Sequence, residues 1–158
     1  VVVEGQDVGT KYACMHQPLY HTLDGGIQPS SHFFMFVPVI DKIKEVLSPC
    51  DTLYRARAYL TFSSPETTPL QPHVDEQWPN ISCVFYISDA DGDTILYKEH
   101  FNENPYLNPD KPTEAGRVPP KKNTLVLFRG DRLHSAGIPA ESTRRLIANI
   151  NFELCNEE

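Results

Sequence analysis

The clearest repeat of apolar and polar positions in this chain lies between residues 36 and 47. Its apolar side chains recur at intervals of three and four residues: Phe36, Val39, Ile40, Ile43 and Leu47. Pro38 stands near the start of this run, and Pro49 lies just beyond its end. The spacing predicts an amphipathic helix of about three turns. The residues before it show no clear period and contain turn-forming Gly and Pro clusters.

From residue 53 onward the pattern changes to short apolar, β-branched and aromatic runs separated by Pro, Gly, Asp and Asn. These runs predict strands over 53–62, 70–75, 81–88, 93–98, 124–128, 132–137 and 144–153. Between them, residues 99–122 hold five prolines and predict a long connection that is either functional or mobile. One helix followed by short strands predicts a mostly β fold, an antiparallel barrel or jelly roll with a helical layer against one sheet.

Length and composition narrow the function classes. The 158 residues predict a single domain, 1–158, with helical support in 1–52 and a β core in 53–158. A formal charge of −7 argues against a nucleic-acid partner, and no apolar run approaches a membrane span. The cysteines, which have no CxxC spacing, are predicted to be reduced thiols in a cytoplasmic protein: Cys14, Cys50, Cys83 and Cys155.

Three side chains form the strongest candidate site. His73 and Asp75 are two apart, so in a strand they point to the same face and can reach one metal ion together. With six histidines and 21 acidic residues in the chain, such a pair alone is weak. His134 in a later predicted strand strengthens it, because two imidazoles and one carboxylate are the ligands of non-haem Fe(II) oxygenases. The sequence therefore predicts an iron site.

The stretch from Tyr54 to Phe152 resembles the 2-oxoglutarate/Fe(II)-dependent dioxygenases, in particular their prolyl-hydroxylase-like branch in phage and bacteria. The pieces that carry the resemblance keep their order and spacing: Arg57–Tyr59, Pro72–Glu76, Val84–Ser88, Asp91–Thr94, Leu125–Phe128, His134–Gly137 and Arg145–Phe152. The resemblance implies a double-stranded β-helix. It also implies that His73, Asp75 and His134 bind Fe(II), with 2-oxoglutarate and O₂ as cosubstrates, and it allows for ascorbate as a further cofactor.

The resemblance also implies that an arginine of the last strand binds the distal carboxylate of 2-oxoglutarate. Arg144 and Arg145 are both candidates. Arg145 shares its strand face with Asn149 and Asn151, whereas Arg144 shares an apolar face, so Arg145 is favoured. The family pattern, with an aromatic seven residues later, selects Arg145 too.

Three aromatic side chains are weaker candidates. The resemblance places Tyr86 and Tyr59 near the cosubstrate, although a core role would also explain either one. Trp78, shortly after the ligand pair, is a candidate for the substrate mouth, although a lone tryptophan more often packs inside a fold.

The implied reaction is hydroxylation of a substrate C–H bond with release of succinate and CO₂. A prolyl or other peptidyl residue is the first choice of substrate, from the resemblance alone. A small metabolite and an alkylated nucleic acid are enzymatic alternatives, and the negative charge opposes the second. Relatives that repair nucleic acid carry a second arginine where this chain has Asn151. A cupin-like binding protein without turnover is the alternative from another class. The oligomeric state is open.

Overall fold

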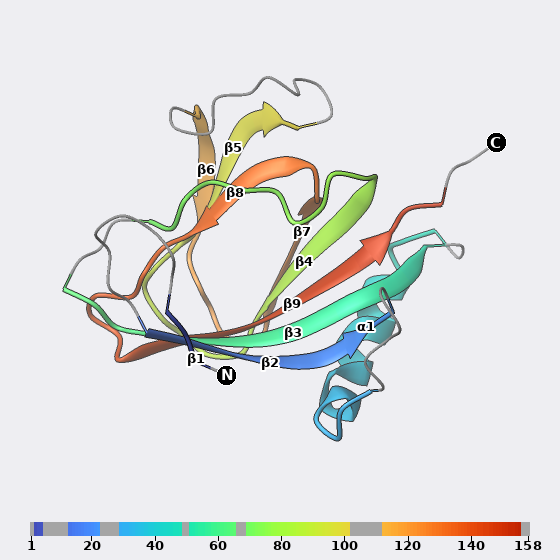
Figure 1. The fold of residues 1–158 in the computed structure, drawn as a ribbon, viewed down its shortest axis with the longest axis horizontal. Coiled ribbons are helices and arrows are strands. Elements are labelled where there is room, and N and C mark those ends of the chain that lie inside the picture. The colour runs from blue at the N-terminus through green and yellow to red at the C-terminus, as the bar shows by residue number, and fades with distance from the viewer. Residues whose placement is uncertain are drawn as a thin grey trace.

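The computed structural model describes residues 2–4, 13–22, 29–48, 51–65, 69–101 and 112–155. Its strands form two antiparallel sheets that face each other (Figure 1). The larger sheet has the order β1-β2-β3-β9-β4-β7, and its strands are β1 Val2–Glu4, β2 Ala13–His21, β3 Thr52–Phe62, β9 Arg144–Glu153, β4 Asn80–Tyr86 and β7 Thr124–Arg129. The smaller sheet has the order β6-β5-β8, formed by β6 Glu114–Val118, β5 Thr94–His100 and β8 Arg132–Ala136.

Strand alternation gives the larger sheet two different faces. Its outer face is apolar and packs against a short 3₁₀ turn, Phe33–Phe36, and the helix α1, Val37–Lys44 (Figure 1). The buried cluster between them contains Leu19, Ile40, Ile43, Ala56, Cys83, Ala148, Ile150 and Phe152. Its inner face carries the alternate residues of the same strands and looks towards the smaller sheet. The predicted jelly-roll class and its supporting helix are therefore confirmed.

Most predicted strands are present, but the one predicted over 70–75 is wrong. That segment makes only an isolated bridge between His73 and His134, together with a bond from the Leu70 N–H to the Ala136 carbonyl. Pro69 and Pro72 have no N–H to donate, so a continuous ladder cannot form along this segment.

Three strands of the fold lie where the sequence predicted none: β1, β2 and β6. β1 and β2 fall in the early region without a clear period; β1 pairs with β2, and β2 pairs with β3 over most of its length. A register shift between Pro18 and Tyr20 interrupts the alternation that would have revealed it. β6 falls inside the predicted connection 99–122 and pairs with β5, while residues 102–111 lie outside the described part of the chain.

The prediction that every cysteine is reduced is wrong for Cys155, which is disulfide-bonded. Cys14 and Cys83 are free thiols, and Cys50 lies outside the described residues. The chain brings Cys155 beside the segment that precedes β3, since its backbone N–H donates to Asp51 Oδ1 at 3.1 Å. The cysteines therefore give no support for a reducing compartment, and the cytoplasmic location stays a prediction.

Within the described residues, no helix combines the length and the apolar character that a membrane crossing requires.

The turn before β5 ties the two sheets together. The Asp91 carboxylate accepts backbone N–H groups of Ala140, Glu141 and Ser142 at 2.6, 2.9 and 2.8 Å, in the loop that leads into β9. Burial alone would raise the pKa of Asp91, but these hydrogen bonds hold it far below its usual range. Gly92 follows with φ +86°, and a Cβ there would lie 2.7 Å from the Gly137 carbonyl oxygen. Only glycine suits this close approach.

Replacing Gly92 by Ala should lower the free energy of unfolding by about 2–4 kcal/mol, since it adds both a left-handed backbone penalty and a clash. Urea denaturation measures the change. Gly116→Ala is the matched control, because a Cβ there meets nothing within 4 Å. Equal stability changes in the two variants would contradict this account of the turn.

Candidate metal centre

His73 and His134 are brought together by one backbone bridge. The two residues exchange both N–H···O bonds, each at 2.9 Å, so they lie directly opposite each other and their side chains share a face. Their ring centroids are 4.6 Å apart. Asp75 lies two residues beyond His73, and one ligand atom from each of the three side chains lies within 4.8 Å of the others. The structure therefore brings the predicted trio together.

Both imidazoles are held in the orientation that a metal ligand needs. His73 Nδ1 lies 3.0 Å from the Gln71 carbonyl oxygen, and His134 Nδ1 lies 3.0 Å from that of Arg132. A carbonyl can only accept, so each Nδ1 carries the proton and each Nε2 keeps a free lone pair. Burial, followed by the nearby His73, lowers the pKa of His134 to about 4, so His134 is neutral at physiological pH.

The Asp75 carboxylate is surrounded by donors from the inner face of the larger sheet. Oδ2 accepts hydrogen bonds from Ser82 Oγ at 2.5 Å and Asn151 Nδ2 at 2.9 Å, and Asn149 Nδ2 lies 3.4 Å away. Arg55 forms an ion pair with Oδ1 at 3.2 Å. Burial would raise the pKa of Asp75, but His134, Ser82, Arg55 and His73 together lower it. Asp75 is therefore ionised.

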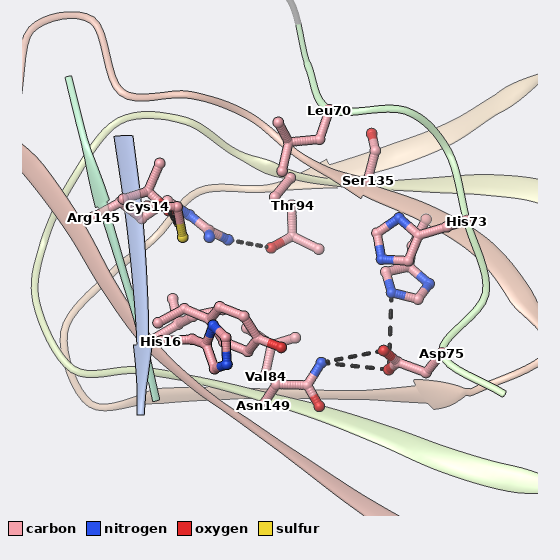
Figure 2. Close-up of a pocket in the computed structure, with 15 residues that line it drawn as sticks. Cys14, His16, Leu70, His73, Asp75, Val84, Thr94, Ser135, Arg145 and Asn149 are labelled. Atoms are coloured by element: carbon pink, nitrogen blue, oxygen red, sulfur yellow. Dashed lines mark hydrogen bonds and ion pairs between the residues drawn. The ribbon is translucent and has the colours of Figure 1, made fainter. Parts of the chain in front are cut away.

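A cavity of about 350 Å³ opens in front of these three groups, between the two sheets (Figure 2). Two imidazole nitrogens and one carboxylate on one wall fit a divalent transition metal, with room on the cavity side for other ligands. The donor set thus fits the ferrous ion that the sequence predicted.

The opposite end of the cavity holds Arg145 (Figure 2). Its side chain is 2% exposed and donates from one terminal nitrogen to Thr94 Oγ1 at 2.9 Å, while its Nε has no hydrogen-bond partner among the described residues. Its guanidinium carbon lies 5.7 Å from the Tyr86 ring centroid. A buried cation without a carboxylate partner is costly, so this end of the cavity is suited to an anion. Arg144, on the other strand face, is exposed.

Of the three aromatic residues that the sequence predicted near the site, one lines the cavity and two do not. Tyr59 lines the cavity. Tyr86 lies beside Arg145, but its hydroxyl is engaged by Thr94 Oγ1 at 2.7 Å and it is not part of the cavity lining. Trp78 packs near Tyr54, with ring centroids 5.9 Å apart, and is also not part of that lining.

Several lining residues were missed by sequence reasoning. Cys14 and His16 come from β2, which the sequence did not predict, and both line the cavity. In the pairing of β2 with β3, Cys14 lies opposite Thr61 and His16 lies opposite Tyr59. Asn149 lies on the polar face that the alternation of the last strand indicates, but nothing in the sequence shows that it contacts Asp75.

No family model and no curated protein matches the chain. Solved structures do share its fold. A 2OG-Fe(II) oxygenase family oxidoreductase from Burkholderia pseudomallei is similar with a TM-score of 0.68 and 12% identity, over 99% of this chain and 73% of that chain. A Pseudomonas putida prolyl-4-hydroxylase gives a TM-score of 0.53 and 15% identity, over 98% and 78%.

A third similar structure is HygX from Streptomyces hygroscopicus, solved with nickel and 2-oxoglutarate bound. Its TM-score is 0.56 with 10% identity, over 90% of this chain and 70% of that chain. The chain spans less of two others, 66% of the epimerase SnoN and 38% of EvdMO1. The fold is therefore that of the 2-oxoglutarate/Fe(II) oxygenases, a double-stranded β-helix, as the sequence resemblance implied.

The cysteines offer a chemical check of the cavity. Iodoacetamide should modify Cys14, which is partly exposed in the cavity, long before Cys83, which is 0% exposed with a pKa raised by burial to about 12. Peptide mass mapping of the folded protein measures the two rates, and denatured protein serves as the control. Equally fast labelling of Cys83 would contradict the packing of β4 against α1.

Proposed function

We propose that this protein is a 2-oxoglutarate- and Fe(II)-dependent dioxygenase that hydroxylates a C–H bond of an organic substrate. The observation that carries the proposal is the arrangement of charge in one cavity: a two-imidazole, one-carboxylate cluster lies on one side, and the buried Arg145, which has no carboxylate partner among the described residues, lies on the other. HygX, which shares the fold, holds a divalent metal and 2-oxoglutarate, and this supports the same pair of ligands here.

In this proposal His73, Asp75 and His134 hold Fe(II), and Arg145 receives the distal carboxylate of 2-oxoglutarate through paired charge-assisted hydrogen bonds. Iron and 2-oxoglutarate supply the oxidising chemistry that inserts one oxygen atom of O₂ into a C–H bond and releases succinate and CO₂. The protein's own groups orient the ligands. Gln71 and Arg132 fix the imidazole tautomers through their carbonyls. Asp75 is intact, which favours hydroxylation over halogenation.

The cavity favours an uncharged reacting group as substrate. Among its described lining residues, Asp75 is the only carboxylate and Arg145 the only Lys or Arg, and both have a role already. A free amino acid would bring an ammonium and a carboxylate without partners, at a considerable desolvation cost. A volume of about 350 Å³, shared with 2-oxoglutarate, is small for a binding site. A prolyl or other peptidyl side chain therefore fits better than a free amino acid.

The nucleic-acid alternative has less support. Asn151 stands where relatives that repair nucleic acid carry a second arginine. It is fully buried and donates a hydrogen bond to Asp75. The net charge of −7 opposes such a substrate as well.

Anaerobic addition of Fe(II) and 2-oxoglutarate should produce a visible charge-transfer band, and air should then release succinate, slowly without substrate and faster with a suitable peptide. His134→Ala and chelation of the metal should each remove both signals, because a ligand or the ion itself is lost. A panel of peptides and metabolites, scored by succinate release, identifies the substrate class. Iron-loaded protein that shows neither band nor succinate would instead support a binding protein of the cupin type.

The two neighbouring arginines give a sharper test of the cosubstrate end. Arg145→Ala should raise the KM for 2-oxoglutarate by about 10- to 100-fold, the loss expected for charge-assisted hydrogen bonds. Arg144→Ala is the matched control and should change this KM less than about twofold, since Arg144 is on the outer strand face. The opposite ranking of the two variants would overturn the assignment.

A further inference from the structure

Arg55 is the one cation in direct contact with Asp75 among the described residues. It belongs to β3 and points to the inner face of the larger sheet, and it is 8% exposed. All three of its nitrogen groups are engaged. One terminal nitrogen pairs with Asp75 Oδ1 at 3.2 Å, the other with Glu76 Oε1 at 2.7 Å, and Nε donates to Asn151 Oδ1 at 3.0 Å. A single planar guanidinium thus holds two consecutive carboxylates and one amide.

The contact with Asn151 fixes a second side chain of the same network. Because the Asn151 carbonyl oxygen accepts from Arg55, its amide nitrogen is turned towards Asp75 Oδ2 at 2.9 Å and Ser82 Oγ at 3.1 Å. Arg55 therefore acts on Asp75 twice, directly through the ion pair and indirectly through the orientation of Asn151. Both effects limit rotation of the carboxylate.

Glu76 gives Arg55 a second carboxylate partner, so Arg55 does not neutralise Asp75 alone. An arginine paired with Asp75 alone would compete with a metal ion for the same carboxylate. Glu76 lies 2.7 Å from one terminal nitrogen and Asp75 3.2 Å from the other, so the charge of Arg55 is shared between two carboxylates. Arg55 therefore orients Asp75, and the Asp75 carboxylate can still bind a cation.

We propose that Arg55 and Glu76 form a clamp that positions Asp75 for metal binding, with Arg55 as the positioning residue and Glu76 as its counter-ion. The inference rests on the proposed function, because it assigns a metal to the three ligands. Arg55 is not among the described residues that line the cavity, so the role proposed for it is in assembling the site and not in contacting substrate.

Mn(II) alone, titrated into the full chain and followed by its electron paramagnetic resonance signal, measures the effect without turnover. Arg55→Met should weaken Mn(II) binding by about 10- to 100-fold, the usual loss when a residue that orients a ligand is removed. Arg57→Met is the matched control. Arg57 lies two residues along the same strand face, forms no hydrogen bond or ion pair with the described residues, and its loss should leave affinity within about twofold.

Two further variants separate geometry from charge. Arg55→Lys keeps the charge, but one ammonium cannot hold two carboxylates and Asn151 in a fixed plane, so affinity should stay well below wild type. Glu76→Gln should cause a smaller loss, about threefold, since Arg55 then pairs with Asp75 alone. In the Arg55→Met background, Glu76→Gln should add nothing, because Glu76 acts through Arg55.

The outcomes are distinguishable from those of the proposed function. Wild-type protein that binds no Mn(II) would end the metal assignment itself. Wild-type protein that binds Mn(II) while Arg55→Met binds it equally or more tightly would overturn the clamp alone, and so would full recovery by Arg55→Lys. If Arg55→Met does not fold, the lysine and glutamine variants decide the question. The Co(II) absorption spectrum supplies a second readout, since altered Asp75 coordination changes it and a purely structural role would not.

Discussion

The structure is organised around one buried carboxylate that must remain ionised. Taking a carboxylate out of water costs several kcal/mol unless donors replace the lost hydration. Asp75 receives those donors from β3, β4 and β9, which contribute Arg55, Ser82, Asn149 and Asn151. These polar side chains share the inner face of the larger sheet with a second apolar cluster, whereas the outer face packs against α1 through an apolar cluster. The donors that offset the desolvation cost of the Asp75 carboxylate also keep it ionised and oriented towards a bound cation.

The cavity separates two charges by a neutral space. Asp75 and the two histidines occupy one wall, and Arg145 occupies the other (Figure 2). Between them the described lining includes aliphatic, aromatic and small polar side chains, among them Val84, Tyr59 and Thr94. A ligand with a metal-binding end and a distal carboxylate satisfies both ends at once. This complementarity is what makes 2-oxoglutarate a better proposal than a generic anion.

The shared fold leaves the reaction outcome to the side chains. SnoN, an epimerase, and a prolyl-4-hydroxylase both have this architecture, so the sheets alone cannot distinguish their chemistries. In this chain the distinguishing side chains are those that line the cavity away from the ligands, such as His16 and Cys14 on β2. Neither of them is a carboxylate or a guanidinium, unlike the pair at the two ends. Substrate choice is therefore expected to depend on β2 and on the segments around the mouth.

The sequence by itself determined the helix, most strands and the grouping of His73, Asp75 and His134, while the preference for Arg145 over Arg144 stays a prediction. Those predictions rest on local periodicity and on chemical type, which are properties of neighbouring residues. Only the tertiary structure decided that 70–75 forms a single bridge, that β2 contributes to the cavity, that Cys155 is disulfide-bonded, and that Arg55 holds Asp75 and Glu76 together. Each of these depends on contacts between residues distant in the chain, or on proline and a register shift that hide the local pattern. Such contacts leave no period in a single sequence, so sheet pairing had to be seen before they could be assigned.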